Sequence, residues 1–105
     1  MPDFIQVVTT AASKEQAARI AQHLLDRRLA GCVQVSGPIS SSNWWQGKLE
    51  TAEEWYCIIK TTAARYPEVE AAIRTVHQYD VPEILAFPVV FGSKNYLDWL
   101  ADTLR

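Results

Sequence analysis

A polar and aromatic segment, His77-Gln78-Tyr79-Asp80-Val81-Pro82-Glu83, places an imidazole, a phenol and two carboxyl groups close together in the sequence. His77 falls at the end of a predicted helix, where the helix dipole stabilises a cationic side chain. An imidazole near carboxylates is also a set from which a metal site or a ligand pocket is built. Both a capping role and a metal or pocket role therefore remain open for His77.

Lys60 lies in an otherwise apolar stretch, so its burial would require a carboxylate partner or a role in a pocket. Glu83 is a suitable partner by type. The two cysteines, Cys32 and Cys57, form no C-x-x-C pair and stand in apolar surroundings. We interpret them as small buried hydrophobic residues in a reducing compartment.

Acidic and aromatic residues gather around a predicted hairpin. Strand alternation places Glu50 and Glu54 on one face and Glu53 on the other, which we interpret as a solvated strand surface. Trp44 and Trp45 point to opposite faces, and each is predicted to lie in an interface or a core.

No catalytic signature appears in the sequence. A Gly-rich phosphate loop, a G-x-S-x-G elbow, an H-E-x-x-H motif and a C-x-x-C pair are all absent. His23, the only other histidine, lies in a predicted helix, where we interpret it as a solvent-side or boundary residue rather than a ligand. We expect a protein that is not an enzyme.

The first half of the chain alternates between strand and helix patterns. Residues 4–9 form a short, β-branched, apolar run typical of a central strand. Ser13 and Gln16 form a capping box in front of a helix predicted over residues 14–29, and Gly31 is its expected C-cap.

A long hairpin is predicted next. Residues 32–35 read as a strand that breaks at Ser36-Gly37-Pro38, and Gln46-Gly47 forms a tight turn. The second arm, residues 48–62, is long for a strand and is expected to project beyond the core.

The last third of the chain completes the pattern. Pro67 opens a helix that ends near His77, and residues 84–87 form a buried strand. Pro88 implies an edge or a bulge before a further strand segment, Val89–Phe91, and Ser93 caps a last helix.

The order β-α-β-β-α-β-α predicts one α+β domain over residues 1–105. Its expected architecture is a ferredoxin-like split β-α-β sandwich, with a four-stranded antiparallel sheet, a long projecting β-hairpin and an extra C-terminal helix. Both main helices would cover one face of the sheet. The other face would expose Trp45, Tyr56 and Ile58, so we expect association between copies of the chain.

Composition excludes several classes of partner. The 105 residues carry 10 basic and 12 acidic side chains, a formal net charge of −2, and no dense basic stripe for nucleic acid. No apolar run is long enough to span a membrane. The segment Met1-Pro2-Asp3-Phe4 has an acidic residue where a signal peptide carries basic ones, so a cytoplasmic location is expected.

Several motifs, taken together, resemble the CutA family of divalent-cation tolerance proteins. The resemblance covers essentially the whole chain, in the same order as in the family. The segments that carry it are Ala30-Gly31-Cys32-Val33-Gln34-Val35, Trp44-Trp45-Gln46-Gly47-Lys48-Leu49-Glu50, Ile59-Lys60-Thr61, His77-Gln78-Tyr79-Asp80-Val81-Pro82-Glu83-Ile84 and Tyr96-Leu97-Asp98-Trp99-Leu100.

This resemblance implies a cytoplasmic homotrimer whose long hairpins wrap the neighbouring subunits. It also implies a role in tolerance of copper and other divalent metals. The similarity of such trimers to PII signalling proteins gives an alternative, in which an intersubunit cleft binds a small anionic ligand, with Lys60 as its countercharge and His77 nearby.

The copper ligands described for the family are matched at one position of three. Thr9 stands where the family has a cysteine, Val76 replaces the first histidine, His77 matches the second, and Gln78 replaces a proline. His77 is therefore the predicted metal ligand, and one imidazole gives a weak site for copper or another divalent cation. A further hypothesis is an intersubunit pocket lined by Cys32, Lys60, His77, Tyr79 and Glu83.

Overall fold

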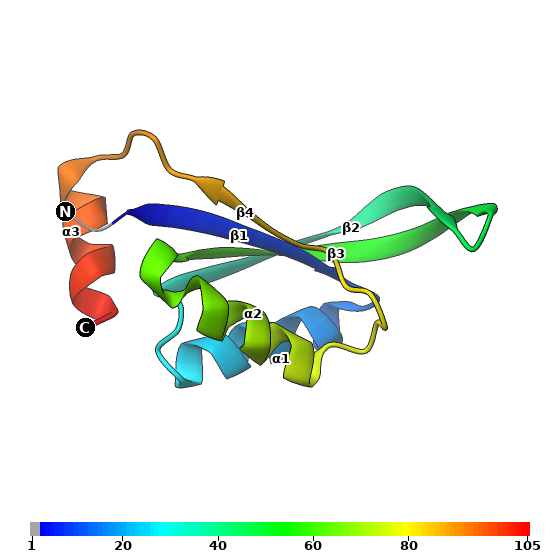
Figure 1. The fold of residues 1–105 in the computed structure, drawn as a ribbon, viewed down its shortest axis with the longest axis horizontal. Coiled ribbons are helices and arrows are strands. Elements are labelled where there is room, and N and C mark those ends of the chain that lie inside the picture. Colours follow the sequence, from blue (N-terminus) through cyan, green and yellow to red (C-terminus); the bar gives the residue numbers. More distant parts are fainter. Residues whose placement is uncertain (1–2) are drawn as a thin grey trace.

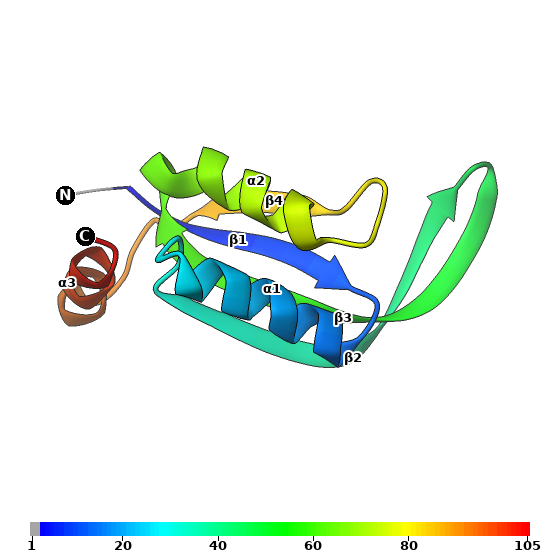
Figure 2. The same ribbon diagram turned by 90° about the horizontal axis from the view of Figure 1, so that it is seen from below.

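The computed structural model describes residues 3–105, so Met1 and Pro2 of the predicted domain lie outside the described residues. It confirms the predicted α+β fold: a four-stranded antiparallel sheet of order β2-β3-β1-β4 carries α1 and α2 on one face (Figures 1 and 2). The elements are β1 (Phe4–Ala11), α1 (Lys14–Asp26), β2 (Cys32–Trp45), β3 (Lys48–Thr62), a 3-10 turn (Ala63–Arg65), α2 (Tyr66–Val76), β4 (Ile84–Pro88) and α3 (Lys94–Thr103).

The main core lies between the sheet and the two helices. Alternate residues of β1 and β3 point toward the helices, and fully buried aliphatic residues of α1 and α2 meet them. The buried side chains in this layer include Val7, Ile59, Ile20, Leu24, Val69 and Ile73.

The start of α1 forms only half of the predicted capping box. Ser13 Oγ accepts from the backbone N–H of Gln16 at 3.0 Å, as predicted. The Gln16 side chain, however, does not return to Ser13. Its Nε2 donates to the carbonyl of Val76 at 2.9 Å, because the end of α2 packs beside the start of α1 and its last carbonyls need donors.

The first helix ends at Asp26, three residues before the predicted end. Arg28 takes a left-handed conformation (φ 54°), and the N–H groups of Arg28 and Leu29 bond to the carbonyls of Leu25 and Leu24. This is a Schellman-type ending, in which Arg28 occupies the position predicted for Gly31. Gly31 instead allows close approach of Leu100, which a side chain at this position would obstruct.

The predicted break at Ser36-Gly37-Pro38 is wrong, because β2 continues to Trp45. The pairing of β2 with β3 shifts between Ser36 and Ile39, so the ladder contains a bulge rather than an end. Pro38 has no N–H to donate, which explains why the irregularity falls here. Long pairing on both sides of the bulge keeps the strand in the sheet.

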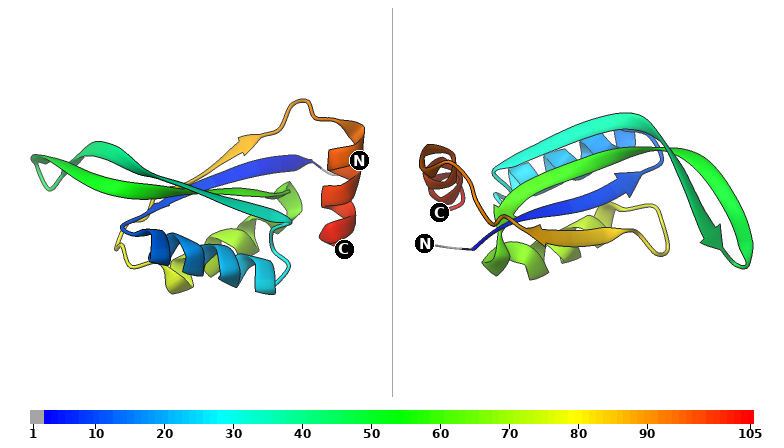
Figure 3. Two further views of the ribbon diagram at one scale, coloured as in Figure 1. Left: turned by 180° about the vertical axis from the view of Figure 1, so that it is seen from behind. Right: turned by 90° about the horizontal axis from the view of Figure 1, so that it is seen from above.

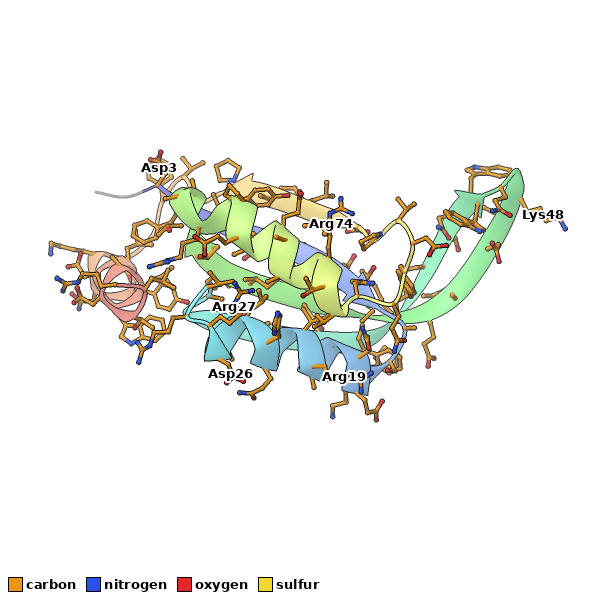
Figure 4. All side chains as sticks on the ribbon, turned by 60° about the horizontal axis from the view of Figure 1, so that its bottom comes forward. Asp3, Arg19, Asp26, Arg27, Lys48 and Arg74 are labelled. Atoms are coloured by element: carbon orange, nitrogen blue, oxygen red, sulfur yellow. The ribbon has the colours of Figure 1, made fainter. Side chains whose placement is uncertain are left out.

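The predicted turn and projecting hairpin are both present. Gln46 (φ 50°) and Gly47 (φ 80°) form the turn between the paired residues Trp45 and Lys48. The hairpin reaches well past α1 and α2 in a molecule 44 Å long (Figures 1 and 3). Lys48 points into solvent at its tip (Figure 4).

The predicted strand segment Val89–Phe91 does not form. The N–H of Val89 bonds to the carbonyl of Phe4, where β1 begins, and beyond this point the chain has no strand of residues 3–105 beside it. It leads instead to α3, which packs through Leu100 and Leu104 against Phe4 at the end of the sheet opposite the hairpin (Figure 3). Within residues 3–105, no helix has the length and apolar character needed to cross a membrane.

Candidate functional site

His77 ends α2, and both of its ring nitrogens make hydrogen bonds. Nε2 lies 2.7 Å from the carbonyl oxygen of Thr10, and Nδ1 lies 3.1 Å from the backbone nitrogen of Tyr79. A carbonyl can only accept and a backbone N–H can only donate. The bonds therefore fix a neutral imidazole, protonated on Nε2, with its lone pair on Nδ1.

Tyr79 connects this loop to the hairpin. Its phenol donates to Glu54 Oε2 at 2.7 Å, and its ring lies 4.8 Å from that of His77. Desolvation, followed by the hydrogen bond and the charge of Glu54, raises the pKa of Tyr79 to about 12. The phenol is thus held as a neutral donor to a carboxylate.

Two cavities lie beside this contact. The larger, of about 420 Å³, separates the loop after α2 from one face of the hairpin, and Glu50, Glu54 and Asp80 contribute its carboxylates. The smaller, of about 240 Å³, is lined in part by Thr10, Tyr79 and Glu83. Three of the predicted site residues, His77, Tyr79 and Glu83, therefore gather at the hairpin end of the sheet.

The other two predicted site residues lie elsewhere. Cys32 and Lys60 face each other across β2 and β3, six residues along β3 from Glu54, or about 20 Å. Lys60 Nζ donates to Gln6 Oε1 at 2.5 Å, so the prediction that Glu83 is its partner is wrong within one chain. A glutamine on the neighbouring strand supplies the acceptor that burial requires.

The structure offers little for a chelated metal around His77. Thr9, at the position matched to a family cysteine, is fully buried, and its hydroxyl has no hydrogen-bond partner in the part of the chain that the structure describes. Among the described residues no group of three His, Cys, Asp or Glu side chains is arranged to hold a metal ion. Burial raises the pKa of the Cys57 thiol to about 11, so Cys57 stays protonated, and its Sγ donates to the carbonyl of Ala17.

The role of Glu54 is not predictable from its place in the sequence. Glu50 and Glu54 lie on one face of the strand, opposite Glu53, as predicted, but the prediction that all three are solvated is wrong for Glu54. Glu54 is half-buried and holds Tyr79. The alternation of side chains along the strand was the only signal in the sequence for the position of Glu54. Nothing in the spacing of the residues shows that the loop after α2 reaches the hairpin.

Comparisons with known proteins agree over the whole chain. A family model described as CutA1 divalent ion tolerance protein matches residues 5–103. The divalent-cation tolerance protein CutA of Archaeoglobus fulgidus is 42% identical over 105 residues, which cover all of both chains. The protein of the same description from Thermus thermophilus is 38% identical over 96 residues, covering 91% of this chain and 93% of the relative.

Solved structures show the same similarity in three dimensions. The structure described as the periplasmic divalent cation tolerance protein CutA from Archaeoglobus fulgidus superposes with a TM-score of 0.92 at 42% identity, covering both chains in full. The crystal structure of CutA1 from Oryza sativa superposes with a TM-score of 0.95 at 36% identity, covering 99% of this chain and 95% of that one.

Proposed function

Because the chain belongs to the CutA1 family of divalent ion tolerance proteins, we propose that it acts in copper tolerance as a homotrimer that binds cations weakly through His77. The match to the family over residues 5–103 carries this proposal. We expect a cytoplasmic protein that works by binding rather than by catalysis.

The geometry of His77 supports a weak, single-imidazole site. Imidazoles that bind metals commonly donate their second ring N–H to a carbonyl, as Nε2 does here to Thr10. The metal would then take the lone pair of Nδ1, which now accepts from the N–H of Tyr79. Binding must replace that hydrogen bond, which lowers the affinity and couples it to the position of the loop.

Exposed apolar side chains at both ends of the molecule support association between copies. At the hairpin tip the exposed fractions are 73% for Trp44 and 63% for Leu49, and Phe91 is 92% exposed at the opposite end. Surfaces of this kind are uncommon on a protein that remains a single chain. Hairpins that reach across neighbouring subunits would cover them.

The alternative, an intersubunit cleft for a small anionic ligand, is not favoured. The relatives are named for divalent cations. The countercharge proposed for an anionic ligand, Lys60, already donates to Gln6. Lys60 also lies far along β3 from the loop that contains His77.

Calorimetric titration of Cu(II) and Zn(II) into the chelator-treated protein tests the cation site. His77→Ala should weaken binding at least tenfold. His23→Ala, which removes the only other histidine, should leave binding unchanged. Wild-type affinity should also fall in acid, because protons compete for Nδ1. Equal affinity of His77→Ala and wild type would refute the assignment of His77, provided that thermal unfolding shows both proteins folded.

A further inference from the structure

The larger cavity has the size of a small-molecule site and is separate from the proposed cation ligand. Its volume of about 420 Å³ falls in the range of ordinary ligand pockets, roughly 300–1,000 Å³. Its walls come from three segments: β2, β3 and the loop after α2. His77 is not among the residues that line it.

The charge of the lining selects a cation. Glu50, Glu54 and Asp80 contribute three carboxylates, and no lysine, arginine or histidine stands among the described residues that form the wall. The bond from Tyr79 uses only Oε2 of Glu54. An anionic ligand would be repelled here.

The spacing of these carboxylates does not suit a single metal ion. Glu50 and Glu54 are four residues apart on one face of β3, about 13 Å along the strand. Oxygen ligands of Ca²⁺ or Mg²⁺ lie only about 2–2.6 Å from the ion. A ligand with two positive groups held apart by a spacer would satisfy both carboxylates.

The remaining walls suit a hydrocarbon spacer. Trp45 faces the cavity from β2 with an indole that is 43% exposed, and Val81 and Ala52 add apolar surface. An indole attracts ammonium groups and packs against methylenes. The side-chain amides of Asn43 and Gln78 offer oxygen acceptors for further N–H groups.

We propose that this cavity binds a linear polyamine, with ammonium groups on Glu50 and Glu54 and its methylene chain along Trp45. Asp80 adds a third negative charge from the loop. Trp44 and Leu49, which we propose contact other copies of the chain, are paired on the face of the hairpin opposite the cavity. Binding to the cavity therefore does not use the Trp44–Leu49 pair.

Calorimetric titration of spermidine into the full chain, with EDTA present, tests this site. Glu50→Gln should weaken binding at least tenfold by removing one anchoring charge. Glu53→Gln is the matched control, because Glu53 lies on the opposite face of the same strand. It removes an equal charge and should leave the affinity unchanged. Butylamine, with one ammonium group, should bind at least tenfold more weakly than spermidine.

Three results would overturn the proposal. The first is no saturable binding of spermidine to the wild-type protein. The second is an equal loss of affinity in Glu53→Gln and Glu50→Gln, which would indicate attraction to surface charge alone. The third is equal affinity for butylamine and spermidine. EDTA removes metal ions, and none of the variants alters His77, so these outcomes are independent of the test of the cation site.

Discussion

Three side chains, His77, Tyr79 and Glu54, form a continuous connection from the end of β1 to the hairpin. His77 bonds to the carbonyl of Thr10, the backbone of Tyr79 bonds to His77, and the Tyr79 phenol bonds to Glu54. Each donor in this series of three hydrogen bonds has one acceptor. The loop after α2 is therefore positioned by hydrogen bonds, and a change at any of the three residues will affect both cavities.

The phenol of Tyr79 gives the residue-scale prediction. Its pKa of about 12 should appear as a late component in an absorbance titration of the phenolate groups, and this component should be missing in Tyr79→Phe. Glu54→Gln should shift it toward the ordinary value of about 10. A Tyr79 component already near 10 in the wild-type protein would contradict the bond to Glu54.

The raised pKa of Tyr79 also determines in which direction the stability of the folded protein changes with pH. The folded pKa is above the unfolded one, so the unfolded chain loses its proton first as pH rises. The contribution of Tyr79 to the stability of the folded protein is fully present below about pH 10 and is lost between about pH 10 and 12. Over that interval, the urea midpoint of wild type should fall more than that of Tyr79→Phe.

At the scale of elements, Gln16 joins the two helices that cover the sheet. It is 2% exposed and donates from the start of α1 to the last carbonyl of α2. Neither helix end could be buried here with its polar groups unpaired. This contact holds α2 in position and therefore also determines where His77 and the following loop begin.

Gln16→Leu should reduce the free energy of unfolding by about 1–3 kcal/mol, because it leaves the half-buried Val76 carbonyl without its donor. Gln22→Leu is the control in the same helix. Gln22 bonds only to the exposed Asp26, so its loss should cost about 0.5 kcal/mol or less. Urea unfolding of both variants measures the difference. Equal stabilities would show that the contact between the helices contributes nothing.

The elements were predictable because each has a local pattern. Alternation located the strands, the apolar stripes located the helices, and Gln46-Gly47 located the turn. The errors occurred where a distant partner decides the outcome. Pairing with β3 keeps β2 continuous through Pro38, and the carbonyl of Val76 attracts Gln16 away from Ser13.

The candidate site was less predictable for the same reason. His77 and Tyr79 were singled out because their types cluster in one segment, and the structure brings them together. Glu54 lies 25 residues before Tyr79, and no periodicity connects the two. The wrong pairing of Lys60 with Glu83 has the same origin, because only the register of β1 with β3 shows that Gln6 is beside Lys60.

At the scale of the whole molecule, the two ends differ from the middle. In the middle, α1 and α2 cover one face of the sheet, whereas the hairpin tip and the segment before α3 expose aromatic and aliphatic side chains. The sheet face opposite the helices carries Tyr56 and Ile58, which are only half-buried in one chain. The proposed homotrimer accounts for all of these surfaces, and the proposed function depends on it.

Sedimentation equilibrium at micromolar concentration tests this assembly most directly, and Leu49→Glu and Lys48→Glu are the informative variants. Wild type should have three times the 11.9 kDa mass of one chain. Leu49→Glu should dissociate, because it places a charge in the apolar tip, whereas Lys48→Glu, on the other face of the tip, should remain associated. A wild-type mass of one chain would contradict the account.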